Sequence, residues 1–313
     1  MGLPTRTIGD LTVSAIGLGC MPMSFPEMVD HRQRAIDTIH RALDVGITFL
    51  DTANIYSPSW DTVGHNERLV AEALRTYTGP ADLVDVVVTT KGGLTRSAGE
   101  EWGRDSTAAG LRAACEASMQ ALEVDSITLY QHHRHDPSLT YRSQAETLGS
   151  LRDEGLIRRI GLSNVTAKEL LLAVDVLGGP DDGGVVSVQN EWSPRYRHGA
   201  DVLDACTRLG IAYLPWSPLG GSTQAHDIGD RYVAFTEVGS QVRATAQEAI
   251  LAWLLATSPV MIPIPGATRP ATVDSIVRSL DITLCPEQMR DLDATEPQMD
   301  SMYPDDLPRS ALG

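Results

Sequence analysis

Lysine is scarce in this sequence. Of the 25 basic residues only Lys91 and Lys168 are lysines, so arginine supplies nearly every generic positive charge. A lysine in such a chain is a candidate for a chemical role. Lys168 lies in an amphipathic segment and is expected to be solvated, which leaves Lys91 as the candidate.

Positive charge is scarce overall as well. The chain has 41 acidic residues and a formal net charge of -16. Nucleic acid and anionic membrane surfaces would therefore be repelled at long range. We expect neither of them as a partner, while the oligomeric state stays open.

Paired cysteines and long apolar runs are also missing. The four cysteines, Cys20, Cys115, Cys206 and Cys285, have no paired spacing, which argues against a disulfide framework and a zinc motif. No run of about 18 apolar residues occurs, and the first residues lack the charged and apolar regions of a secretory signal. We therefore expect a soluble, cytoplasmic protein with reduced thiols.

The chain has enough apolar residues for a large core, since 42% of its 313 residues are hydrophobic and 21% are charged. Eight short apolar segments, several of them rich in β-branched residues, are predicted as strands. Their ranges are 14–19, 49–52, 84–91, 126–133, 157–164, 185–191, 211–217 and 260–266. Eight amphipathic segments are predicted as helices: 31–45, 66–76, 106–122, 141–154, 166–176, 200–209, 241–257 and 270–280.

This alternation predicts an α/β fold, a (β/α)8 TIM barrel that uses residues 1–313 as a single domain. An open, doubly wound sheet is the second possibility. Residues 5–13 are predicted to form an N-terminal β-hairpin and residues 286–296 a C-terminal extra helix. Long loops follow the second, third and seventh strands, at 53–65, 92–105 and 218–240. Because such loops meet at the C-terminal face of a barrel, we expect the functional site there.

Four polar residues lie at or just beyond the ends of consecutive predicted strands: Asp51 and Tyr56, then Lys91, then His133. Each alone could be a helix cap, a loop anchor or a packing residue. Together they suggest a proton donor, because a neighbouring ammonium favours ionisation of a phenol and a carboxylate keeps that ammonium charged. His133 could orient a carbonyl oxygen toward Tyr56.

Several motifs resemble those of the aldo-keto reductase superfamily in both order and spacing. They are DTANIY with NERLVAEAL, VVVTTKGG, LYQHHRHDP, IGLSN, VSVQNEWS, PWSPLGG and PIPGATRP, and the N-terminal TRTIGDLTVSAIGLGCM is also similar, so the resemblance runs from residue 5 to about residue 280. The resemblance implies an oxidoreductase that transfers hydride between NADP(H) and a small carbonyl substrate. It also implies Tyr56 as general acid, Asp51 and Lys91 as the pair that tunes it, and His133 as the residue that orients the carbonyl. His132 is expected to face the helices, and His135 to lie in a loop.

The same resemblance implies a cofactor site without a phosphate-binding glycine fingerprint. Ser163, Asn164 and Gln189 would bind the carboxamide, and Trp216 would stack on the nicotinamide ring. The remaining contacts would be Gly19, Cys20 and Met21 at the ribose, Ser217, Leu219 and Gly220 at the pyrophosphate, and Gly266, Thr268 and Arg269 at the adenine end. The chain departs from the family pattern at Thr272, Ser275 and Ile276, which keeps NAD(H) open as an alternative.

Trp60, Trp102 and Trp192 are candidate walls of a substrate pocket, although Trp192 could equally be a packing residue. Loop 220–240 could form a lid over the cofactor or simply be mobile. Two other functions stay open. One is a nucleotide-bound regulatory or scaffold protein on the same barrel. The other is a metal hydrolase that uses His132, His133, His135 and Asp136, although neighbouring strand residues point to opposite faces and make a shared ion difficult.

Overall fold

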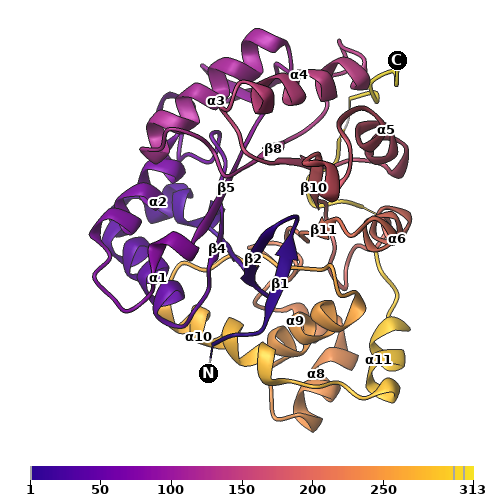
Figure 1. The fold of residues 1–313 in the computed structure, drawn as a ribbon. Helices are drawn as coiled ribbons and strands as arrows, with labels where there is room; N and C mark the ends of the chain where they lie inside the picture. Colours follow the sequence, from indigo (N-terminus) through magenta and orange to yellow (C-terminus); the bar gives the residue numbers. More distant parts are fainter. Residues whose placement is uncertain (1, 299, 306) are drawn as a thin grey trace.

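The protein is described by a computed structural model that covers residues 2–298, 300–305 and 307–313. A curled parallel sheet forms its centre, and helices surround the sheet (Figure 1). The strands follow the order β3-β4-β5-β8-β9-β10-β11, so nearly every strand pairs with the next one along the chain. Their bounds are β3 Leu18–Gly19, β4 Phe49–Asp51, β5 Val87–Gly92, β8 Leu129–His132, β9 Ile160–Ser163, β10 Val185–Gln189 and β11 Ala212–Tyr213. The predicted α/β barrel is confirmed.

Residues 260–266 fill the position of the eighth strand without forming a regular one. Isolated bridges join Tyr213 to Met261 and Gly19 to Gly266, and so connect the two ends of the sheet. The carbonyls of Pro263 and Pro265 accept hydrogen bonds from the amides of Gly17 and Gly19. A proline has no amide hydrogen to donate in return, so this segment cannot build a regular ladder. The prediction of eight regular strands was therefore wrong at this segment, although its place in the barrel was right.

The predicted N-terminal hairpin is confirmed, with β1 (Thr5–Ile8) antiparallel to β2 (Leu11–Ser14). Ile8 and Val13 are buried in an apolar cluster with Phe49, Leu129 and Ile262 from the strand segments. The hairpin therefore adds its apolar side chains to the core within the strand ring.

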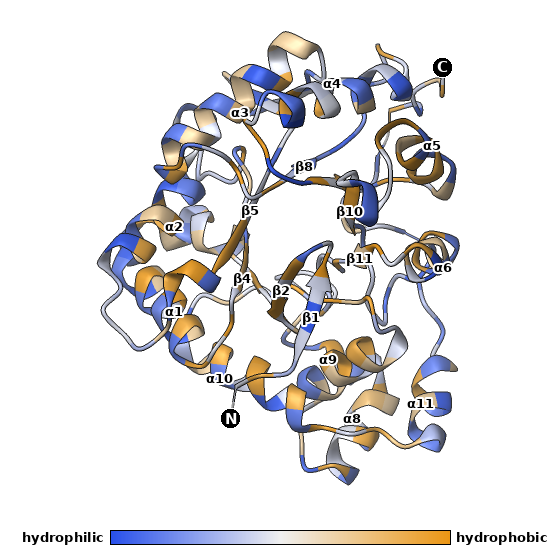
Figure 2. Cartoon of the chain, in the orientation of Figure 1, coloured by the Kyte–Doolittle hydropathy of each residue, from blue (hydrophilic) through white to orange (hydrophobic). Residues whose placement is uncertain are grey.

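Eight helices agree with the predicted amphipathic segments to within a few residues. They are α1 (Arg32–Asp44), α2 (His65–Thr76), α3 (Ala108–Leu122), α4 (Tyr141–Asp153), α5 (Ala167–Leu177), α6 (Ala200–Leu209), α9 (Ala246–Thr257) and α10 (Pro270–Arg278). Figure 2 shows hydrophobic and hydrophilic residues on the same outer helices, as expected for elements that cover a core and face water. No helix in the described ranges is long and apolar enough to cross a membrane.

Two segments predicted as loops contain regular structure. Residues 92–105 include an antiparallel hairpin, β6 (Leu94–Ser97) with β7 (Glu101–Arg104). Residues 218–240 include α7 (Ile228–Arg231) and most of α8 (Val233–Gln241). Phe235 of α8 is fully buried, and its ring centroid lies 5.5 Å from that of Trp253 in α9. The second half of the proposed lid is thus packed against the barrel.

Short elements complete the chain. The C-terminal helix α11 covers Pro286–Asp293 and is slightly shorter than predicted. The 3-10 turns are η1 (Met21–Ser24), η2 (Pro26–His31), η3 (Trp60–Thr62), η4 (Leu83–Asp85), η5 (Pro180–Asp182) and η6 (Ser279–Asp281). After α11 the chain returns across the molecule, where the carbonyls of Ala311 and Leu312 accept from the amides of Tyr141 and Arg142. The final residues therefore lie against the start of α4.

Candidate active site

The barrel brings Asp51, Lys91 and Tyr56 into direct contact. Lys91 Nζ donates to Asp51 Oδ2 at 2.8 Å, to the carbonyl of Thr52 at 2.9 Å and to the Tyr56 hydroxyl at 3.2 Å. The Lys91 side chain is fully buried, and that of Asp51 is 4% exposed. All three hydrogens of the ammonium thus have acceptors.

Neighbouring strands explain this arrangement. Asp51 ends β4 and Lys91 lies near the end of β5, and these strands pair in parallel, with Asp51 opposite Thr89. Tyr56 lies in the turn that follows β4, and its carbonyl accepts from the amide of Asn66 in α2. The loop therefore brings the Tyr56 hydroxyl back to the Lys91 ammonium, although four residues separate Tyr56 from Asp51.

The groups of this cluster shift one another's pKa values. Burial alone would lower the pKa of the Lys91 ammonium, but Asp51 and Tyr56 outweigh that effect and raise it above its usual value. Burial raises the pKa of the Tyr56 phenol, while the Lys91 charge acts in the opposite direction. In this state Tyr56 is a protonated phenol beside a charged amine, which is the form a proton donor requires.

His133 contacts the same cluster. Its ring lies edge-on to that of Tyr56, with centroids 5.8 Å apart and planes at 82°. Burial and the Lys91 charge hold the pKa of His133 well below its ordinary value. The imidazole is therefore neutral near pH 7, and one ring nitrogen can donate a hydrogen bond to a substrate oxygen.

The other two histidines of the motif point elsewhere. His132 Nε2 lies 2.8 Å from the Ser106 hydroxyl, and its ring is near Tyr141 of α4, so it faces the helices as strand alternation predicts. His135 Nε2 lies 3.1 Å from the carbonyl of Pro308 in the C-terminal segment. Within the described ranges no group of three or more histidine, cysteine or acidic side chains is placed to hold a metal ion.

Polar side chains that could bind a carboxamide meet at the ends of β9 and β10. Asn164 Nδ2 donates to the Ser163 hydroxyl at 3.0 Å, and Trp216 Nε1 donates to Asn164 Oδ1 at 3.1 Å. Gln189 Nε2 donates to Asp51 Oδ1 at 2.7 Å. This bond links the group to the tetrad, the set formed by Asp51, Tyr56, Lys91 and His133. Asn164 has a φ of 58°, an uncommon conformation for a residue with a side chain. These four residues fit the polar and aromatic requirements of a nicotinamide.

The residues expected at the ribose and phosphates lie on three neighbouring loops. Gly19 ends β3 and Cys20 follows it, with Met21 beginning η1, and the Cys20 amide donates to the carbonyl of Asp51. Ser217 and Gly220 both have positive φ, at 48° and 75°, in the turn that also contains Leu219. Gly266 and Thr268 precede α10.

Arg269 is the N-cap residue of α10 and is exposed to solvent. Its Nε donates to Thr272 at 3.3 Å, and it forms no ion pair with any residue in the described part of the chain. An exposed guanidinium beside the amides of a helix start fits a phosphate. Ser275 donates to Glu248 and Ile276 is buried, so neither side chain is available at this end of the site.

The three candidate tryptophans differ in their surroundings. Trp60 and Trp102 are 43% and 59% exposed, on the loops after β4 and β5, and Trp102 lies under the Arg96 guanidinium. Trp192 is buried and contacts Tyr213 edge-on, with centroids 6.0 Å apart. Its surroundings favour the packing alternative for Trp192.

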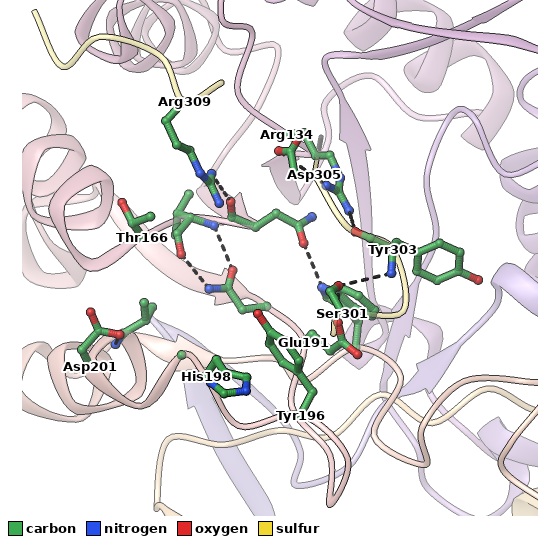
Figure 3. Close-up of a pocket in the computed structure, with 16 residues that line it drawn as sticks. Arg134, Thr166, Glu191, Tyr196, His198, Asp201, Ser301, Tyr303, Asp305 and Arg309 are labelled. Atoms are coloured by element: carbon green, nitrogen blue, oxygen red, sulfur yellow. Dashed lines mark hydrogen bonds and ion pairs between the residues drawn. The ribbon is translucent and has the colours of Figure 1, made fainter. Parts of the chain in front are cut away.

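The C-terminal segment 300–305 and 307–313 adds residues that the sequence analysis did not identify. It borders a pocket of about 280 Å³, shown in Figure 3, beside Trp216 and Asn164. The ring of Tyr303 lies 5.7 Å from that of Trp216. Asp305 accepts from Arg104 of β7, and Arg134 donates to the carbonyl of Tyr303 at 2.8 Å. The segment is thus attached to the loops that follow β5 and β8.

Glu191 makes the second attachment, because its carboxylate accepts from the Ser301 hydroxyl (Figure 3). The same carboxylate also accepts from the Met302 amide. These contacts could not be predicted from the sequence, because residues 300–313 lie beyond every recognised motif and have the composition of a polar tail that contains proline.

A parallel α/β barrel with a buried carboxylate and ammonium and a half-buried phenol at the ends of its strands defines an enzyme class, and comparison with known proteins identifies it. A model of the Aldo/keto reductase family matches residues 15–297. An uncharacterized oxidoreductase of Schizosaccharomyces pombe is 32% identical over 292 residues, which cover 92% of this chain and 89% of the relative. Pyridoxine 4-dehydrogenase of Escherichia coli is 28% identical over 302 residues, or 94% and 98% of the two chains.

Solved structures of other proteins have the same fold. A Klebsiella pneumoniae aldo/keto reductase, crystallised in complex with NADP and acetate, superposes with a TM-score of 0.77 at 24% identity, over 96% of this chain and 98% of that one. The chain belongs to the aldo/keto reductase family and is an oxidoreductase of that family.

Proposed function

We propose that this oxidoreductase reduces an aldehyde or ketone to an alcohol with NADP(H), and that Tyr56 is the general acid. The observation that carries the proposal is the contact of Lys91 Nζ with both Asp51, at 2.8 Å, and the Tyr56 hydroxyl, at 3.2 Å. Among the described residues the site offers no activated nucleophile for acyl transfer: the nearby thiol, Cys20, is fully buried and burial raises its pKa.

The bound cofactor would supply the hydride. Ser163, Asn164 and Gln189 would hold its carboxamide and Trp216 its ring, while Arg269 and the start of α10 would bind a phosphate. Because Arg269 has no acidic partner among the described residues, we prefer NADP(H) to NAD(H).

The chain's own residues would handle the substrate oxygen. His133, neutral near pH 7, would donate a hydrogen bond to the carbonyl oxygen and orient it toward Tyr56. The Tyr56 hydroxyl would deliver its proton to that oxygen as negative charge develops there, and Lys91 would stabilise the phenolate that remains. Asp51 would keep Lys91 charged and in place.

The test is a panel of carbonyl compounds incubated with the purified protein and NADPH, followed by the loss of NADPH absorbance. The panel includes pyridoxal, because one relative is a pyridoxine 4-dehydrogenase. We expect turnover with at least one compound, and a loss of about 100-fold or more in Tyr56→Phe, which keeps the ring but lacks the proton.

Two outcomes would overturn the proposal. A protein that binds NADPH but oxidises it with no compound would favour the regulatory or scaffold alternative. A Tyr56→Phe variant with normal turnover would remove Tyr56 from the chemistry.

A further inference from the structure

Inside the barrel, beside the Lys91–Asp51 pair, lies a fully buried glutamine that the proposed mechanism does not use. Gln131 is at the centre of β8, opposite Lys91 in the parallel register with β5. Its Nε2 donates to Asp51 Oδ1 at 3.3 Å and to Thr89 Oγ1 at 2.9 Å.

The two carboxylate oxygens of Asp51 accept hydrogen bonds from different donors. Oδ2 accepts from the Lys91 ammonium at 2.8 Å, whereas Oδ1 accepts from the side-chain amides of Gln189 and Gln131. Gln189 Nε2 also donates to Gln131 Oε1 at 3.3 Å. Both hydrogens of each amide therefore have acceptors, and the network leaves few alternative arrangements for a buried carboxylate.

The neighbouring strand is built to leave room for Gln131. Gly161 of β9 lies opposite Gln131, and a Cβ atom at Gly161 would fall 2.7 Å from Gln131 Cγ and 2.5 Å from Ser187 Oγ. Only glycine permits the glutamine side chain to reach Asp51 at this point.

We propose that Gln131 is a positioning residue that fixes Asp51 through Oδ1, so that Oδ2 stays on Lys91 and Lys91 stays on Tyr56. The proposal rests on the proposed function of the tetrad. Gln131 would also have a second role when the cofactor is bound. Gln189 is also the expected ligand of the nicotinamide carboxamide, and when its amide turns to the cofactor, Gln131 remains as the side-chain amide on Oδ1.

The first variant is Gln131→Met, which keeps a similar volume and removes both donors. We expect kcat to fall by about 10- to 100-fold through misplacement of the ammonium, while the dissociation constant of NADPH stays within about twofold. The alkaline limb of the pH–rate profile should move to higher pH. Asp51 with one donor fewer disfavours the phenolate, and an ammonium that has shifted stabilises it less.

The matched control is Ser187→Ala. Ser187 lies in the same interior layer beside Gly161, and its hydroxyl has no hydrogen-bond partner in the described part of the chain. It therefore donates no hydrogen bond to Asp51. In Ser187→Ala, kcat and the alkaline limb should both stay at their wild-type values.

A second variant guards against a folding effect at position 131 itself. Gly161→Ala keeps Gln131 but pushes its side chain away from Asp51, and should reproduce the shift of the alkaline limb in a weaker form. If Gln131→Met and Gly161→Ala both retain wild-type kcat and the wild-type limb, the proposal is wrong. An equal loss of NADPH affinity and turnover would assign Gln131 to the cofactor site instead and also overturn it.

A titration without turnover separates this proposal from the proposed function. Phenolate absorbance of the protein, minus that of Tyr56→Phe, follows the ionisation of Tyr56 alone. An upward shift in Gln131→Met supports the positioning role even if no carbonyl substrate is found, and an unchanged titration contradicts it.

Discussion

At the scale of single residues, the two lysines of this chain have opposite environments. Lys91 is fully buried between Asp51 and Tyr56, whereas Lys168 of α5 is exposed to solvent. The chain thus contains a natural comparison between a lysine with a proposed chemical role and one without.

We predict that Lys91→Met removes nearly all turnover, by about 100- to 10,000-fold, and leaves the affinity for NADPH largely unchanged. The ammonium that stabilises the phenolate of Tyr56 is lost, while no expected cofactor contact is removed. Steady-state kinetics and fluorescence titration with NADPH measure the two effects. Lys168→Met is the control and should behave as wild type; normal turnover in Lys91→Met would contradict the proton-donor account.

The tetrad could be predicted from sequence because each member lies at or near the end of a consecutive strand, and strand ends converge in a barrel. Gln131 could not, because a glutamine inside an apolar strand gives no sign of which side chain it will meet. Its partner Asp51 is 80 residues away in sequence, and the contact depends on Gly161 of a third strand.

At the scale of elements, the closure of the barrel depends on a segment with unusual chemistry. Residues 260–266 pair with β3 through carbonyls of two prolines, and Gly19 and Gly266 face each other at the end of this seam. The sequence placed this segment correctly from its apolar pattern, but its two prolines rule out regular pairing. The β6–β7 hairpin and helices α7 and α8 were missed because they lack strong local periodicity and make contacts with distant residues, such as that of Arg96 with the Ser57 carbonyl and that of Phe235 with Trp253.

Gly19→Ala should weaken this seam. A Cβ atom at Gly19 would lie 2.8 Å from the carbonyl oxygen of Ile264, which belongs to the backbone and cannot rotate away. We predict a loss of about 1–3 kcal/mol in the free energy of unfolding, measured with urea.

Gly179→Ala is the matched control, since nothing lies within 4 Å of its added methyl group and its φ is -92°. Its stability should change by no more than about 0.5 kcal/mol. Equal stability of the two variants would mean that the seam is not tightly packed.

At the scale of the whole molecule, the fold buries neutral imidazoles that an unfolded chain would protonate. The pKa of His132 falls to about 3 because of burial, and that of His133 is also lowered. As pH drops below about 6.5, the unfolded chain takes up protons that the folded chain does not. The two histidines therefore contribute their full stabilisation of the folded state above about pH 6.5, and this stabilisation is lost as the pH falls below that value.

We predict that the free energy of unfolding falls on acidification from pH 7 to 4.5, with His132 alone contributing up to about 1.4 kcal/mol per pH unit. Glu67 and Glu191, whose pKa values are raised by burial, act in the opposite direction. Urea unfolding of wild type and His132→Gln at several pH values isolates the histidine. The variant should show a shallower slope, and identical slopes would contradict the account.

The barrel could be predicted from the sequence because segments with the hydrophobic pattern of a strand alternate regularly with segments that have the pattern of a helix. The course of the final residues was not, since segment 300–305 and 307–313 is held by separate polar contacts with Glu191, Arg104 and Arg134. Such contacts join distant parts of the chain and leave no local pattern.

The burial of Lys91 also has a practical consequence. Amine-reactive dyes and cross-linkers need an accessible lysine side chain, and Lys168 on α5 is the one lysine that offers it. Attachment through lysine would therefore place a fluorophore or a surface linkage at one known position, in the first turn of α5.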